Sequence, residues 1–104
     1  MLFFVKVRVK EGDFSVEELW EAWEPETEAA LGAKGAGKVV DLYKVSGQRR
    51  VLVIMDVDSH DELDRILMAG LPMAHHLEME EVLPLRTYEA FAEDIRSRWG
   101  ARAG

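Results

Sequence analysis

Cysteine is absent from the 104 residues of the chain. Its absence excludes a disulfide scaffold, a thiolate zinc site and a cysteine nucleophile, and it is compatible with the reducing cytoplasm, where we expect the protein to reside. Long apolar runs are also absent, since none approaches the roughly 20 residues of a membrane span. The apolar start of the chain meets Lys6 and Arg8 at once, so we expect neither a signal peptide nor a membrane partner.

Positively charged residues are fewer than negatively charged ones. Lysine and arginine number 13 against 20 aspartates and glutamates, which gives a net charge of −7. Because an acidic chain is repelled by phosphate backbones, we do not expect a nucleic-acid partner. The length suits one domain over residues 1–104, with a core over 1–86 and a C-terminal helix and tail over 87–104.

Alternating hydrophobicity predicts four strands. Residues 2–10 place four apolar side chains on one face, those of Phe3, Val5, Val7 and Val9. Residues 38–45 and 50–57 are separated by a short glycine-containing turn and so form a hairpin. Residues 76–85 alternate again, and the pair Glu80-Glu81 breaks the alternation as a β-bulge would.

Helix signals lie between the strands. Two capping boxes, in which a serine precedes a glutamate by three residues, mark helix starts at Ser15 and Ser59. The ring of Pro25 clashes with the preceding turn, so we expect the first helix to kink near Trp23 or Glu24. We expect this helix to end by Leu31-Gly32. The second should end at Gly70. A last helix carries one apolar stripe, made of Tyr88, Phe91, Ile95 and Trp99.

The order of these elements is strand, helix, strand, strand, helix, strand and a C-terminal helix, with a turn at residues 11–13 and a frayed tail at 100–104. Right-handed crossovers then give an α+β fold of the ferredoxin-like βαββαβ type, an antiparallel sheet with two helices on one face. In this topology the first and third strands are central neighbours, and the fourth strand flanks the first.

The third strand is apolar on both faces. Val51, Val53 and Met55 share one face, while Leu52 and Ile54 share the other. A lone two-layer domain would expose the second face as a patch larger than monomers usually tolerate. We therefore expect a homodimer or higher homo-oligomer packed sheet to sheet, a dimeric α+β barrel. The alternative is that the last helix folds back over this face.

Two short motifs suggest ligands but fit a structural role better. Residues 32–38 match the phosphate-loop spacing G-x-x-x-x-G-K, yet a helix precedes them, a strand follows, and no serine or threonine comes next. Adjacent His75 and His76 would point to opposite sides of an extended chain, and His60 begins a helix, so the histidines do not converge as metal ligands. We expect no cofactor and no metal, although one of the paired histidines could carry a proton.

Charged residues share one face of the first and fourth strands. Lys6 and Arg8 point away from the helices, and Glu78 and Glu80 lie on the same face of the neighbouring strand. A structural interpretation is cross-strand ion pairs, each worth a few tenths to about 1 kcal/mol. A catalytic interpretation is a carboxylate base and a cation in one cavity, which suits proton abstraction next to a carbonyl. Tyr43 could add a hydroxyl donor, or pack at the edge of the core.

Several segments resemble the muconolactone isomerase family in register. They are the opening Met1-Leu2-Phe3-Phe4-Val5-Lys6-Val7, the turn region Leu42-Tyr43-Lys44-Val45-Ser46-Gly47, the segments Asp56-Val57-Asp58-Ser59 and Glu62-Leu63, and Leu71-Pro72 with Leu77-Glu78-Met79-Glu80-Glu81-Val82-Leu83-Pro84-Leu85. The chain departs from the family's usual histidine at Phe4, and a helix after Leu85 replaces a polar tail.

The resemblance implies a cofactor-free isomerase that moves a proton within an unsaturated lactone or related carbonyl compound. On this hypothesis Glu78 is the base, Lys6 faces the enolate, and His75 or Tyr43 donates a proton. The pocket for a small hydrophobic carbonyl or lactone ligand would be lined by Phe4, Arg8, Leu52 and Ile54. Two other functions stay open on the same barrel: a non-catalytic oligomeric ligand-binding module, and a cofactor-free monooxygenase.

Overall fold

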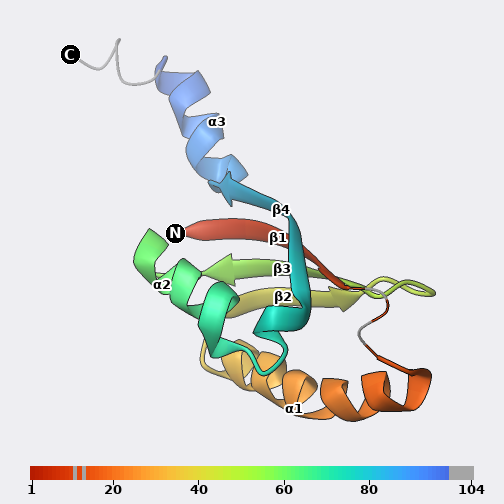
Figure 1. The fold of residues 1–104 in the computed structure, drawn as a ribbon. Coiled ribbons are helices and arrows are strands. Elements are labelled where there is room, and N and C mark those ends of the chain that lie inside the picture. The colour runs from red at the N-terminus through yellow and green to blue at the C-terminus, as the bar shows by residue number, and fades with distance from the viewer. Residues whose placement is uncertain (11, 13, 99–104) are drawn as a thin grey trace.

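The chain folds into an antiparallel four-stranded sheet in the order β2-β3-β1-β4, seen in a computed structural model that describes residues 1–10, 12 and 14–98. The strands are β1 (Leu2–Val9), β2 (Val39–Lys44), β3 (Arg50–Asp56) and β4 (Leu77–Leu85). Helices α1 (Val16–Gly35) and α2 (His60–Arg65) cover one face of the sheet, and α3 (Tyr88–Ser97) follows β4 (Figure 1). The predicted α+β, ferredoxin-like order is confirmed.

Some predicted details lie outside the described residues. They are the ends of the turn at 11–13, of which only Gly12 is described, the tail at 100–104, and Trp99 of the C-terminal stripe.

The central strand β1 alternates between buried and half-buried side chains, as its sequence predicts. Its inward side chains contribute to two separate apolar clusters. One cluster lies under α2 and consists of Phe3, Val5, Met55, Val57, Leu63 and Leu67. The other lies at the start of α1 and consists of Val9, Leu19 and Met73. Each such side chain contributes about 1.5–3 kcal/mol when it is fully buried.

Helix α1 begins at the predicted capping box. The Ser15 hydroxyl accepts the Glu18 N–H, and the Glu18 carboxylate accepts the Ser15 N–H, both at 3.2 Å. Hydrogen bonding of the Glu18 carboxylate to the side chain and the backbone N–H of Ser15 lowers the pKa of Glu18. The predicted end at Gly32 is wrong, because the Gly32 carbonyl still accepts the N–H of Ala36 and the helix runs on to Gly35. Pro25 lies inside the helix, and the kink expected there stays a prediction.

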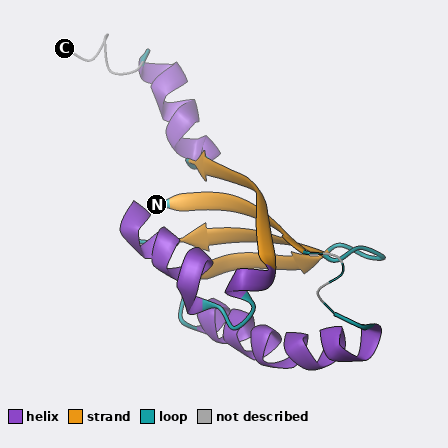
Figure 2. Cartoon of the chain, viewed as in Figure 1, coloured by secondary structure: helices purple, strands orange, loops and turns teal. Residues whose placement is uncertain are grey.

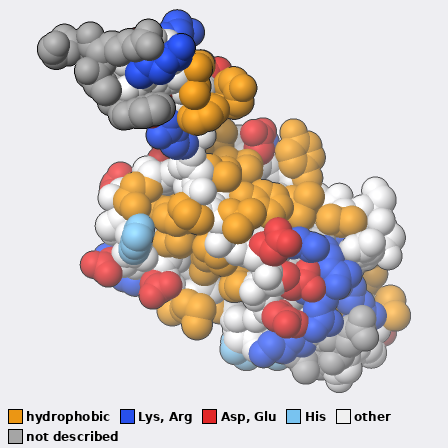
Figure 3. Space-filling model, turned by 90° about the horizontal axis from the view of Figure 1, so that it is seen from above, with side chains coloured by type: hydrophobic (Ala, Val, Ile, Leu, Met, Phe, Trp, Pro, Cys, Tyr) orange, Lys and Arg blue, Asp and Glu red, His pale blue; other side chains and the backbone are white. Residues whose placement is uncertain are grey.

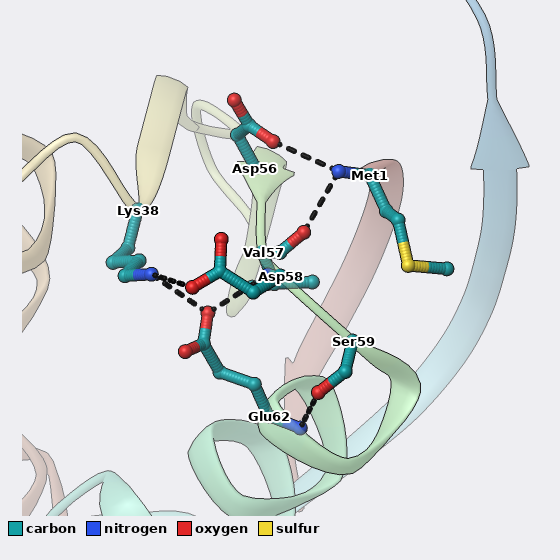
Figure 4. A network of polar contacts seen from close by, with 7 residues as sticks. All are labelled: Met1, Lys38, Asp56, Val57, Asp58, Ser59 and Glu62. Carbon is teal, nitrogen blue, oxygen red and sulfur yellow. Dashed lines mark hydrogen bonds and ion pairs between the residues drawn. The ribbon is translucent and has the colours of Figure 1, made fainter.

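The predicted cap of α2 forms only half of a capping box. The Ser59 hydroxyl accepts the Glu62 N–H at 3.1 Å, but the Glu62 carboxylate accepts from Asp58 N–H at 3.1 Å and from Lys38 Nζ at 2.9 Å (Figure 4). The bond to Lys38 lowers the pKa of Glu62 and raises that of Lys38. This network joins the start of β2 to the start of α2.

A π-helical turn, η1 (Ile66–Gly70), extends α2, and a 3₁₀ turn, η2 (Ala74–His76), leads into β4. Strand β4 therefore begins one residue later than predicted. Lys6 lies opposite Glu81 while Val7 lies opposite Met79, so Glu80 is the extra residue of a bulge and that prediction is confirmed.

Helix α3 projects away from the sheet instead of folding back over it, so the alternative to a partner subunit is wrong (Figures 1 and 2). Its stripe is exposed, with Tyr88 76%, Phe91 44% and Ile95 48% accessible. We call this projecting helix the arm, and the molecule measures 61 Å along its longest axis. The sheet face opposite α1 and α2 is consequently uncovered, and we call it the open face. Hydrophobic side chains gather over its middle, and charged ones gather at the end away from α3 (Figure 3).

Candidate active site between helix α1 and the sheet

A cavity of about 960 Å³ lies between α1 and the helical face of the sheet. Its floor consists of inward-facing strand side chains, among them Val5, Val7, Leu42, Val51, Val53 and Met55. The roof is one side of α1, with Leu19, Trp20, Trp23, Ala30 and Ala33. A largely apolar space of this size fits a small organic ligand.

The cavity exists because α1 does not fill the space between the two core clusters. Ala30 and Ala33 face the cavity, where a longer side chain would occupy it. Trp23 is half-buried, while Trp20 is 73% exposed and stands at the mouth. Trp23 therefore borders the cavity in addition to packing on the core, whereas Trp20 borders the cavity and stays exposed.

Glu26 brings a carboxyl group into this apolar surrounding. It is 8% exposed and is the buried charged residue of the part of the chain that the structure describes. Its Oε2 accepts the backbone N–H of Met73 at 3.0 Å. Burial raises the pKa of Glu26, and the bond from Met73 partly offsets the rise. A carboxyl group in such a place can both accept and return a proton.

Sequence reasoning missed Glu26, although a signal for it exists. Glu26 follows Leu19 by seven residues and Trp23 by three, so all three share one face of α1. A glutamate in an apolar helical stripe is the feature that indicates a buried acid.

The predicted pocket residues come together, but on the opposite face of the sheet from the cavity. Phe4 lies opposite Ile54, and Lys6 lies opposite Leu52, with all four side chains half-buried on the open face. Arg8, two residues after Lys6 on β1, lies on the same face. A ligand held by these residues would need a second layer to cover it, which none of the described residues supplies.

Glu78 pairs with Arg8 instead of Lys6. Arg8 donates to Glu78 and lies 3.6 Å from Glu80, which also accepts two bonds from Arg50 at 2.8 and 3.1 Å. The Arg50 bonds lower the pKa of Glu80, with smaller contributions from the charges of Lys6 and Arg8. This geometry matches the structural interpretation, cross-strand ion pairs, and the role of Glu78 as a base stays a prediction.

The two predicted proton donors lie in different places. Tyr43 is exposed on the edge strand β2 and borders the cavity mouth. His75 is exposed on η2, and its ring lies 4.1 Å from that of His76, so the two rings are neighbours and do not point to opposite sides. In residues 1–10, 12 and 14–98, no three His, Asp or Glu side chains are grouped to hold a metal ion.

The family follows from comparison with known proteins. Residues 1–90 match the muconolactone delta-isomerase family. The chain belongs to this family. A crystal structure of muconolactone isomerase superposes with a TM-score of 0.70 and 26% sequence identity, over 84% of this chain and 90% of that one. Comparison with curated proteins gives no match.

Membership of the muconolactone delta-isomerase family confirms the resemblance found in the sequence. The family match ends inside α3, so most of the projecting arm lies beyond it. None of the described helices is long and apolar enough to cross a membrane.

Proposed function

We propose that the protein is a cofactor-free isomerase that shifts a proton within an unsaturated lactone or related carbonyl compound. The observation that carries this proposal is the buried carboxyl group of Glu26 inside an apolar cavity of about 960 Å³. Family membership supports the reaction class, because the family is named for muconolactone isomerisation.

The reaction needs one group that removes a proton and returns it elsewhere. The Glu26 carboxylate takes a proton from a carbon conjugated with the carbonyl, and the bonding electrons move onto the carbonyl oxygen as an enolate. The protonated Glu26 then gives the proton to another carbon of the same enolate, so the double bond moves and no atom is gained or lost. A raised pKa suits both steps, since it strengthens the Glu26 carboxylate as a base and makes its acid form easier to reach than that of an exposed glutamate.

The test compares Glu26→Gln with Glu78→Gln. Glutamine keeps an oxygen that can accept the Met73 N–H, so the fold should survive in the Glu26 variant. We expect Glu26→Gln to lower kcat by about two to four decades, the usual scale for a positioned general base. Glu78→Gln should keep the wild-type rate, because Glu78 lies on the other face. Turnover of muconolactone and simple unsaturated lactones is followed by NMR.

The opposite result for the two variants would place the active site on the open face instead of in the cavity. If Glu78→Gln loses the rate and Glu26→Gln keeps it, the chemistry belongs to the open face, with Lys6 as the cation beside the enolate. A second candidate function is a ligand-binding module without catalysis, favoured by the ion pairs of Arg8 and Arg50 on that face. A wild type that binds lactones in the cavity and turns none over would support this second function.

A further inference from the structure

The cavity under α1 is elongated along the helix. The α1 residues that border it run from Leu19 to Ala33, a span that rises about 21 Å. On the floor it is bordered by both Val39 and Lys44, the first and last residues of β2, which lie about 17 Å apart along the strand. Helix α1 and β2 lie beside each other over this length (Figure 1). A small lactone therefore fills only part of the cavity.

Glu26 lies near the middle of this length. It follows Leu19 by seven residues and precedes Ala33 by seven, and all three border the cavity. Since seven residues of helix rise about 10 Å, the space extends by about this distance on either side of the acid. A ligand whose reacting carbons lie beside Glu26 therefore has room for a long substituent.

The two halves of α1 differ in the size of the side chains that border the cavity. The half before Glu26 has large ones, those of Leu19, Trp20 and Trp23. In the half after Glu26, Ala30 and Ala33 continue the same helical stripe at spacings of four and three residues. Leu31 also borders this half, but it is 61% exposed. Because alanine carries only a methyl group, the space beside the second half of α1 is left for a ligand.

The two halves also differ in polarity. Charged side chains border the first half, namely Glu21, Glu24, Lys44 and Arg49. The Lys44 Nζ lies 5.7 Å from the centre of the Trp23 ring, which places the end of β2 beside this half. Among the described residues, those that border the second half are apolar, and Val39 lies opposite Met55 on its floor. An apolar substituent is therefore stabilised in the second half, where it leaves water without burying a charge.

The wall of the second half is already packed in the free chain. The Lys38 N–H donates to the Ala33 carbonyl at 3.0 Å, which joins the end of α1 to the start of β2. Met55 and Leu67 border the cavity and belong to the buried core cluster under α2. The space beside the two alanines is consequently formed before a ligand binds, as is usual for small-molecule sites.

We infer that the substrate is an unsaturated lactone or related carbonyl compound with a long apolar substituent, which Ala30 and Ala33 admit. The reacting carbons lie beside Glu26, and a substituent of about eight carbons spans the roughly 10 Å from there to Ala33. The two alanines are specificity-determining residues on this view. The inference rests on the proposed function for the cavity and narrows its substrates to elongated apolar compounds.

The experiment measures, by calorimetry, the binding of unsaturated lactones that carry a methyl, a butyl or an octyl substituent. In the wild type each added methylene should tighten binding by up to about fourfold, the scale of one buried methylene. Ala30→Leu and Ala33→Leu should each lower the ratio of octyl to methyl affinity about 10- to 100-fold, since leucine takes the room of about three carbons. Ala29→Leu, an equal enlargement next to Ala30 that does not border the cavity, should keep the wild-type ratio.

The folded state of each variant is checked by circular dichroism and urea unfolding, and leucine is a good helix former. Wild-type affinity that does not rise from methyl to octyl would overturn the inference, and a segment of a second copy that fills the cavity would give this result. A wild-type ratio in both Ala30→Leu and Ala33→Leu would overturn it too. If one of these variants does not fold, the other and the wild-type series still decide.

The failure of this inference and that of the proposed function give different results. A flat wild-type series together with an inactive Glu26→Gln would remove the long substituent and keep the isomerase. Affinity that rises with chain length and is lowered by Ala30→Leu, in a protein that turns over none of the lactones, would support the inferred ligand and remove the catalytic role.

Discussion

Glu26 shows how one residue acquires a function from its surroundings. The chain has 20 acidic residues, and most of those described lie at the surface, where a carboxylate is well solvated. Glu26 differs because α1 holds it over an apolar floor and a single backbone N–H satisfies one of its oxygens. Its neighbours Pro25 and Thr27 are exposed, so the helical register alone selects it.

The raised pKa of Glu26 makes stability depend on pH. The folded protein holds this proton more tightly than the unfolded chain, so the stabilisation is complete below the ordinary carboxyl pKa, about 4.3, and is lost as pH rises through the raised value. Glu26→Gln has no such loss. Its free energy of unfolding, relative to wild type, should therefore increase between pH 4 and pH 8 in urea titrations. A difference that stays constant over this range would contradict the assigned burial.

At the scale of elements, local sequence signals predicted where the helices begin better than where they end. The hydroxyls of Ser15 and Ser59 compete for N–H groups within three residues, so their caps are visible in the sequence. The prediction that α1 ends at Gly32 was wrong because a glycine ends a helix only when the chain turns there. Here the helical hydrogen bonds continue past it. The cavity was not predictable, since it depends on how far α1 stands from the sheet.

The contribution of the α1 cap to the free energy of unfolding can be measured directly. Ser15→Ala removes the hydroxyl that accepts the Glu18 N–H, and it should destabilise the protein by about 1 kcal/mol, the typical value for an N-cap. Ser46→Ala, in the exposed hairpin turn, is the matched control and should change the free energy of unfolding much less. Thermal or urea unfolding measures both. Equal losses would show that the α1 cap is not specifically stabilising.

At the scale of the whole molecule, two apolar surfaces have no cover among residues 1–10, 12 and 14–98. The open face carries Phe4, Leu52 and Ile54, and α3 carries Tyr88 and its stripe. Helices as short as α3 are marginal alone in water, so a partner that packs on the stripe would stabilise it. The homo-oligomer predicted from the two-sided apolar strand remains our proposal for that partner.

Ile54→Lys tests the open face. If two copies pack sheet to sheet, the lysine places a charge in their interface, which costs several kcal/mol unless a partner relieves it. The variant should dissociate or precipitate, as measured by light scattering. Ser46→Lys, in the exposed hairpin turn between β2 and β3, adds the same charge outside the strands and is the control. A wild type that is monomeric at micromolar concentration would contradict the assembly.

Pro84 limits the form that any assembly can take. It lies opposite Phe3 on the edge strand β4, and a proline offers no N–H to a further strand at a sheet edge. Growth into a fibre needs both edges of every sheet, β2 as well as β4, whereas pairing through β2 alone joins two molecules and then stops. We therefore expect any edge-to-edge pairing of copies of this chain to use β2 and to stop at two molecules, and replacing Pro84 with valine should remove a barrier against further strand addition.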